Sequence, residues 1–156
     1  MTRFLAPLFM ALLYVTPPSF IAEARQLRDA NAHALVIIRG RVVCLDEWGS
    51  RTDALLGCGK QTTHFGLVDK DANLHVFDPA DSSTAVFTDD RVRARDLQVT
   101  ARLNTKQQLE LIKVQSVREG KLYDIYYFCE ICNIRAYAPG PCPCCHNELE
   151  FRETPP

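Results

Sequence analysis

Hydrophobic and polar residues alternate along several short runs of this chain, which is the pattern of β-strands with one buried and one exposed face. In residues 97–103 every second position is apolar, and the positions between them are polar. Residues 34–47 are rich in β-branched side chains and carry Gly40 within the apolar series, where we expect a bulge or a sharp bend. The same reasoning predicts further strands over residues 64–69, 73–78, 96–104, 109–117 and 122–128.

The segments between these runs carry turn-forming residues. Lys70-Asp71-Ala72 fits a hairpin turn, and residues 105–107 and 119–121 are expected to form two more turns. Residues 79–95 are mixed and are expected to form a short helix or a loop. The chain is therefore predicted to be mainly β, with a five-stranded domain over residues 34–120 and a smaller C-terminal module over residues 121–156.

Five strands in this order resemble the OB-fold barrel, over roughly Ala32 to Arg118. The likeness rests on the long first strand with its glycine and on the irregular connection between the third and fourth strands. A different small barrel or a sandwich is the alternative. The resemblance implies that a ligand would bind on strands two and three and the adjoining loops, where the candidate residues are Trp48, Lys60, His64, Phe65, His75 and Phe77. Alternatively, both phenylalanines fill the barrel and both histidines are solvated.

The N-terminus has the pattern of an export signal over residues 1–24. Arg3 is followed by the apolar run Phe4 to Val15, a proline pair and an Ala-x-Ala site that ends at Ala24. The apolar run is short for a membrane span, which needs about 20 residues. We therefore expect a cleaved signal peptide, a linker over residues 25–33, and a periplasmic or secreted protein that meets the membrane only during export. An uncleaved anchor is the alternative.

Composition and charge narrow the possible partners. The hydrophobic content of 47% and the charged content of 24% are those of a globular protein, and the formal net charge is −1. The arginines of residues 91–96 are offset by nearby aspartates, so we expect no nucleic-acid partner. A protein is the expected partner.

Five of the seven cysteines lie close together near the C-terminus. Their spacing is Cys129-x2-Cys132-x9-Cys142-x2-Cys145, with Cys144 inside the second pair. Two such pairs supply four thiolates, each pair on a tight turn, and this arrangement suits a tetrahedral Zn²⁺ ion. Four thiolates also close the coordination shell, which favours a structural over a catalytic metal.

The stretches "YFCEIC" and "PGPCPCC" resemble the zinc-ribbon or rubredoxin-like module, over about Tyr126 to Arg152. The resemblance implies a small β-ribbon that holds one metal ion through the two cysteine pairs. In iron-binding rubredoxins a glycine commonly follows the second cysteine of each pair, whereas this chain has Asn133 and His146 there. That departure favours zinc over iron. Disulfides, or a redox-active or iron site, are the alternatives, since an exported protein meets oxidising conditions.

The remaining cysteines suggest other chemistry. Cys144 should lie at the surface of the ribbon, either as a thiol without a role or as a reactive thiol. Cys44 and Cys58 are a candidate disulfide, with a buried free thiol at Cys44 as the alternative. A metal site that also includes His64 is a weaker possibility.

These features predict an exported, non-enzymatic binding or assembly module with a structural zinc site. The sequence carries no recognisable catalytic motif, although that absence does not exclude an enzyme. A redox or metal-handling protein of the cell envelope is the alternative function. Single-stranded nucleic-acid binding ranks third because of the charge and the export signal.

Overall fold

The computed structural model describes residues 33–46, 48–51, 58 and 64–156. The predicted signal peptide, most of the predicted linker and Lys60 lie outside these described residues. Within the described residues, no helix is long and apolar enough to cross a membrane.

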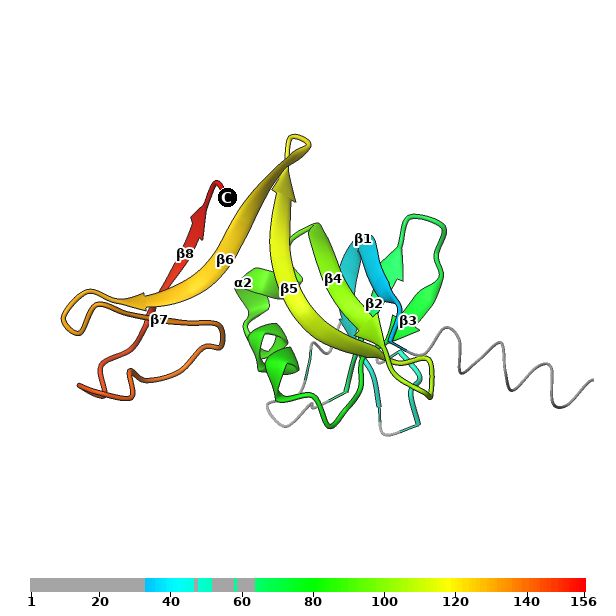
Figure 1. Ribbon diagram of the computed structural model, residues 1–156, viewed down its shortest axis with the longest axis horizontal. Helices are drawn as coiled ribbons and strands as arrows, with labels where there is room; N and C mark the ends of the chain where they lie inside the picture. Colours follow the sequence, from blue (N-terminus) through cyan, green and yellow to red (C-terminus); the bar gives the residue numbers. More distant parts are fainter. Residues whose placement is uncertain (1–32, 47, 52–57, 59–63) are drawn as a thin grey trace, which may run out of the picture.

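Eight strands form one open antiparallel sheet in the order β3-β2-β1-β4-β5-β6-β7, and β8 pairs with β6 (Figure 1). Each predicted strand range overlaps one of these strands, with β5 and β6 running one residue or so beyond the predicted ends, so the mainly β class is confirmed. The strands are β1 (Leu35–Cys44), β2 (Phe65–Asp69), β3 (Leu74–Val76), β4 (Leu97–Leu103), β5 (Leu109–Arg118), β6 (Lys121–Cys129), β7 (Ile134–Ala136) and β8 (Glu150–Thr154).

The predicted closed barrel is wrong, because the sheet stays open between β3 and β5. The contact between these two strand ends is a single parallel bridge between Phe77 and Leu109. Strand β3 is only three residues long, so it is too short to form a ladder with β5. The far end of β5 pairs instead with β6, over Gln115 to Arg118.

Gly40 lies where β1 changes its main partner. The first half of β1 pairs with β4 and the second half with β2, and Gly40 is in register with both Leu97 and Asp69. A Cβ atom at residue 40 would lie 2.2 Å from the carbonyl oxygen of Val68, closer than any real Cβ contact. The predicted bend is therefore a close approach of two strands that only glycine allows.

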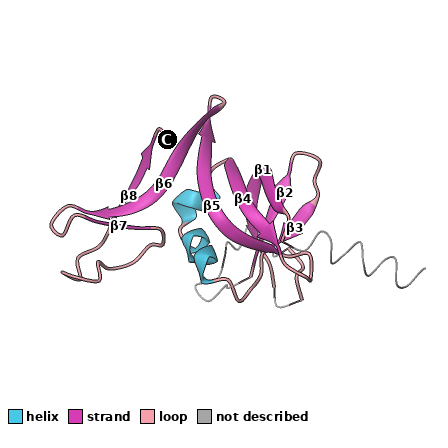
Figure 2. Cartoon of the chain, in the orientation of Figure 1, coloured by secondary structure: helices cyan, strands magenta, loops and turns pink. Residues whose placement is uncertain are grey.

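Residues 79–95 form two short helical segments, η1 (Ser82–Thr88) and α2 (Asp90–Arg93), which fits the predicted helix or loop. Asp81 caps η1 by accepting a 2.9 Å hydrogen bond from the Ser83 N–H, and Asp89 caps α2 by accepting one of 2.8 Å from the Arg91 N–H. Figure 2 shows these segments between the two parts of the sheet.

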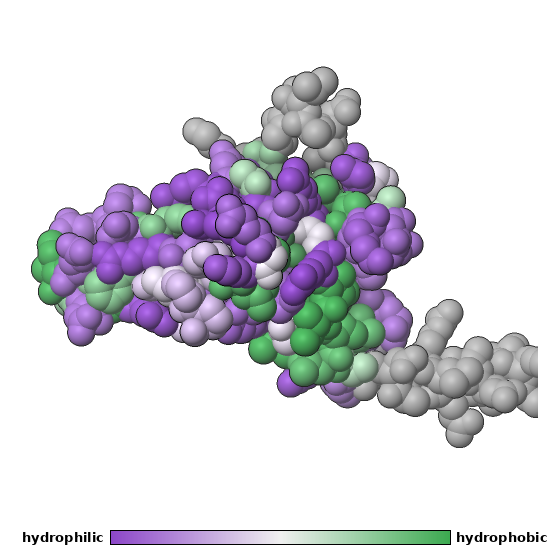
Figure 3. Space-filling view, turned by 90° about the horizontal axis from the view of Figure 1, so that it is seen from above, coloured by the Kyte–Doolittle hydropathy of each residue, from purple (hydrophilic) through white to green (hydrophobic). Residues whose placement is uncertain are grey.

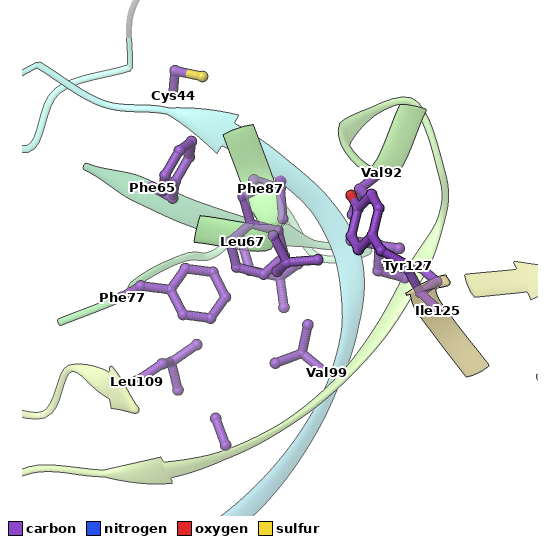
Figure 4. Packing of buried hydrophobic residues seen from close by; sticks show 14 of the residues in the cluster. Cys44, Phe65, Leu67, Phe77, Phe87, Val92, Val99, Leu109, Ile125 and Tyr127 are labelled. Carbon is purple, nitrogen blue, oxygen red and sulfur yellow. The ribbon is translucent and has the colours of Figure 1, made fainter. Parts of the chain in front are cut away.

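The core lies between the curved sheet and the helical segments (Figure 4). Phe87 from η1 packs against Phe65 and Phe77, with ring centroids 5.7 Å and 4.9 Å apart. Tyr127 from β6 is fully buried, and its hydroxyl donates a 2.8 Å hydrogen bond to Asp89. Strand β6 thus joins the N-terminal lobe (β1–β5 with η1 and α2) to the C-terminal lobe (β6–β8 and their connecting loops).

Candidate metal centre

The four cysteines of the two predicted pairs converge at one end of the C-terminal lobe. Cys129 is the last residue of β6, Cys132 lies in the turn to β7, and Cys142 and Cys145 lie in the loop between β7 and β8. Their Sγ atoms all lie within 4.8 Å of one another, and those of Cys129 and Cys145 are 3.5 Å apart. A tetrahedral Zn²⁺ site with Zn–S bonds of about 2.3 Å has sulfur–sulfur edges of about 3.8 Å. The donor set therefore fits such an ion.

The two cysteine pairs share a backbone feature. Asn133 and His146 each follow the second cysteine of a pair, and both have left-handed backbone angles, with φ of 53° and 62°. Glycine adopts this conformation most easily, which explains its frequency at these positions in the rubredoxin-like module. Asparagine and histidine are among the side chains that tolerate the conformation best. Both turns therefore adopt the left-handed conformation without a glycine.

Main-chain bonds hold the second pair in place. The Cys142 N–H donates to the Asn147 carbonyl at 2.7 Å, and the His146 N–H donates to the Cys142 carbonyl at 2.9 Å. Pro141 and Glu148 form an antiparallel bridge across the base of this loop. The backbone is thus closed around the cysteine pair by its own hydrogen bonds.

Backbone amides stabilise negative charge at Cys142. Hydrogen bonds from the N–H groups of Cys145 and Cys144 lower the pKa of the Cys142 thiol to about 7. By contrast, the neighbouring Cys144 and Cys145 thiols raise the pKa of Cys132. Thiols this close together cannot all be anionic unless a cation balances their charge, so the cluster favours a bound metal ion over four free thiolates.

The centre is shielded from water but its donors do not distinguish zinc from iron. Cys129 and Cys142 are buried, and Cys132 and Cys145 are half-buried. Sulfur donors in a tetrahedron suit either metal. The structure therefore supports a four-cysteine metal site of the zinc-ribbon-like type.

Cys144 differs from its neighbours because its side chain is exposed and lies outside the group of converging sulfurs. This is the surface position expected for the middle residue of a C-x2-C turn. His146 also lies outside that group. Cys44 and Cys58 form the predicted disulfide, with Cα atoms 5.5 Å apart.

The predicted ligand-binding residues that the structure describes have different surroundings. Phe65 and Phe77 are buried in the core against Phe87, as in the alternative reading of these residues. Trp48 is 83% exposed. The His75 ring lies 2.9 Å from Asp69, whose pKa it lowers together with Asn73. The His64 carbonyl accepts a 2.9 Å bond from the Leu45 N–H, and Lys60 lies outside the described residues.

A groove between β5 and the C-terminal lobe was not expected from the sequence. Leu111 and Ile112 are adjacent apolar residues that break the alternation of β5, and the register with β4 shifts at this place. The two adjacent apolar residues were the feature of the sequence that could have predicted this groove. An extra apolar residue in a strand often marks a bulge that turns a side chain outward.

No family model matches this chain, and no curated protein or solved structure matches it either. What is known of the centre therefore comes from its own residues. The spacing of the cysteines in the sequence and the convergence of their sulfur atoms in the fold indicate the same four residues.

Proposed function

We propose that this protein is an exported, non-enzymatic binding or assembly module whose C-terminal lobe is a zinc ribbon. The convergence of four cysteine sulfurs within 4.8 Å carries this proposal. The apolar signal-like N-terminus supports export, and the disulfide between Cys44 and Cys58 is compatible with an oxidising compartment.

Zinc would have a structural role in this site. Four thiolates fill a tetrahedral shell and leave no position for a water molecule or a substrate. Outside the centre, the C-terminal lobe consists of one shared strand and two short ones, with little apolar surface to bury. Bound zinc contributes about 10–16 kcal/mol in small zinc-binding peptides, which is enough to order such a lobe.

The decisive experiment is to measure metal content and thiol reactivity on the same purified, exported protein. We expect about one zinc per chain and a single fast-reacting thiol, Cys144, with the four ligand thiols reacting only after chelation. Less than about 0.2 metal per chain would rule out the zinc site, given that one-site stoichiometry. A coloured protein that contains iron would instead favour electron transfer.

A redox function is the second candidate, and one contact favours it. The Sγ atoms of Cys129 and Cys145 lie 3.5 Å apart, so these two thiols are near enough to exchange with a disulfide, and the exposed Cys144 lies beside Cys145 in the chain. Thiol–disulfide exchange would need these thiols to be accessible in the folded protein. Reaction of all five free thiols before chelation would support this function over a structural site.

The binding role is tested by affinity capture of proteins from the exported fraction. The full protein and the Cys144→Ser variant should retain the same partner, because both keep the metal ligands. The Cys142→Ser/Cys145→Ser double variant should lose the partner, because the C-terminal lobe is no longer held. Equal capture by the double variant would show that the lobe is not the binding element.

A further inference from the structure

A groove of about 590 Å³ separates β5 from the C-terminal lobe. Figure 1 shows how it arises, since β5 and β6 meet at their hairpin and diverge below it. Leu111, Ile112 and Val114 of β5 line one side, and Ile125, Tyr126 and Tyr137 line the other. Ile112 and Tyr137 are 52% and 67% exposed, so apolar surface is open to solvent here.

Both sides of the groove offer unpaired backbone. Strand β5 pairs with β6 only from Gln115 to Arg118. The Leu111 N–H is capped by the Asp81 carboxylate at 2.6 Å. The stretch 112–114, on the side away from β4, pairs with no strand of the described residues. Such an edge can pair with an added strand.

The opposite side is a gap in the pairing of β6. On the edge of β6 that faces β5, pairing with β5 ends at Asp124 and pairing with β7 starts at Tyr127. Ile125 and Tyr126 lie between these two ladders, and Tyr126 also lines the groove. An extended chain in the groove would therefore lie between a free strand edge and an apolar wall.

The residues that line the groove include two cationic side chains, Lys113 and Arg135, and one carboxylate, Asp124. Lys113 and Asp124 neutralise each other through a 2.9 Å ion pair. The Arg135 guanidinium lies over the Tyr126 ring, 3.9 Å from its centroid, and its charge helps to lower the pKa of Asp124, but it forms no ion pair with a carboxylate of the described residues. Its charge is held at the groove by the aromatic ring. A carboxylate on the occupant would complement it.

We propose that this groove binds an extended acidic peptide segment of a partner protein. The segment pairs its backbone with residues 112–114, inserts an apolar side chain beside Ile112, and places a carboxylate against Arg135. This inference rests on the proposed protein-binding function and names the surface and the chemistry of the partner. Tyr137 and Ala138 lie in the loop that leads to Cys142, so a bound metal would also hold one wall of the groove.

Other exposed apolar residues provide a matched control. On the face that Figure 3 shows, apolar surface gathers on the N-terminal lobe and the C-terminal lobe is mainly hydrophilic. Ile37 on β1 is 63% exposed and lines neither groove wall. A lysine at residue 37 should therefore change solubility as much as one at residue 112 without touching the groove.

The test uses a displayed library of short random peptides panned on the full exported chain. Enriched peptides should alternate apolar residues and contain Asp or Glu. In fluorescence anisotropy, Ile112→Lys and Arg135→Glu should each weaken binding of a labelled selected peptide by at least about tenfold. Ile37→Lys should change it by less than about twofold. All variants should keep the metal content of the wild type, which shows that the C-terminal lobe is folded.

Two further readouts identify the binding mode. A peptide in which Lys replaces the acidic residue should recover binding to Arg135→Glu, since the charges are exchanged. The amide protons of residues 112–114 should gain protection from hydrogen exchange when the peptide binds, as strand addition requires.

Several results would overturn the proposal. It fails if no peptide is enriched more strongly on the wild type than on the Ile112→Lys variant. It also fails if the groove variants bind the selected peptide as well as the wild type does, or if the amides of residues 112–114 gain no protection from hydrogen exchange. Dimerisation of the wild type that Ile112→Lys abolishes would assign the groove to a second copy instead. If partner capture persists in Ile112→Lys but is lost in Cys142→Ser/Cys145→Ser, only the groove is refuted. If the wild-type protein itself captures no partner, the proposed binding function is refuted.

Discussion

Neighbouring cysteines in the loop between β7 and β8 have different surroundings although they are adjacent in the sequence. Cys142 and Cys145 point toward the other sulfurs of the centre, while Cys144 is exposed. The left-handed turn at His146 follows the cysteine pair and reverses the chain, so that the Asn147 carbonyl accepts the hydrogen bond from the Cys142 N–H. The role of each thiol is therefore set by the geometry of the turn.

A matched pair of serine variants tests this difference. Cys145→Ser should lose its metal during dialysis against a chelator, because serine is a poor zinc ligand and three sulfurs hold the ion weakly. Cys144→Ser should retain about one metal per chain, since it removes no ligand. Metal content by elemental analysis checks both. Equal loss of metal from the two variants would mean that Cys144 is also a ligand.

Asp89 is a second residue whose surroundings define its role. Its side chain is only 7% exposed, and it accepts hydrogen bonds from Arg91 at 2.6 Å and from the Tyr127 hydroxyl at 2.8 Å. Burial alone would raise the pKa of Asp89, but these hydrogen bonds and the Arg91 charge lower it below the ordinary value. The charged carboxylate is thus the form that the fold requires.

The pH dependence of stability follows from this lowered pKa. The contribution of Asp89 is complete above the unfolded pKa of about 3.9 and is lost as the pH falls through the lower folded value. At neutral pH, Asp89→Asn should reduce the free energy of unfolding by about 1–3 kcal/mol. Urea unfolding of both proteins should show this gap closing below about pH 4. A gap that persists in acid would show that the charge is not the cause.

At the level of elements, the course of β1 decides how the sheet is built. Its first half lies beside β4 and its second half beside β2, so a single strand connects both sides of the N-terminal lobe. This arrangement needs close contact at the change of partner, where Gly40 faces the Val68 carbonyl. A glycine in mid-strand costs conformational entropy, and here the close packing of two strands offsets that cost.

Replacing Gly40 tests this packing. Gly40→Ala should destabilise the protein by about 1–3 kcal/mol, because the added methyl group overlaps a backbone carbonyl that cannot move without breaking the β1–β2 ladder. Ile37→Thr in the same strand should change stability by less than about 0.5 kcal/mol, since the side chain is exposed. Thermal and urea unfolding measure both. A neutral Gly40→Ala would show that β2 can move aside.

At the level of the whole molecule, β6 belongs to both lobes. Besides the Tyr127–Asp89 bond, a buried carboxylate joins them, since Glu153 of β8 accepts hydrogen bonds from Arg95 and Arg118 of the N-terminal lobe. Arg91 of α2 also lies over the Phe151 ring, 4.7 Å from its centroid. The C-terminal lobe is therefore packed on the N-terminal lobe, and the cysteine centre lies at its far end.

Metal removal should separate these two contributions. After treatment with a zinc chelator, the amides of β7 and of the loop that carries Cys142 should exchange rapidly, because the metal is the main source of order there. The amides of β1, β2 and β4 should keep most of their protection, since their core does not involve the centre. Hydrogen exchange with and without chelator measures this. Uniform loss of protection would show that the two lobes unfold as one unit.

The sequence predicted the strands well because their alternation reflects burial of one face, which is a local property. It predicted which four cysteines converge because the spacing of Cys129, Cys132, Cys142 and Cys145 encodes two tight turns. It did not predict the open sheet, because closure depends on whether β3 is long enough to pair with β5. It also missed the groove, because Ile112 of β5 and Arg135 of β7 are far apart in the chain and line one groove only in the folded protein.

The sequence by itself thus determined the mainly β class, the positions of the turns and the identity of four converging thiols, since each depends on spacing along the chain. Only the tertiary structure decided that β6 serves two lobes, that Phe65 and Phe77 pack in the core, and that an unpaired strand edge faces an apolar groove. These features depend on which strand edges are used for pairing and which remain free. That is fixed by contacts between residues distant in the sequence, and no local pattern records it.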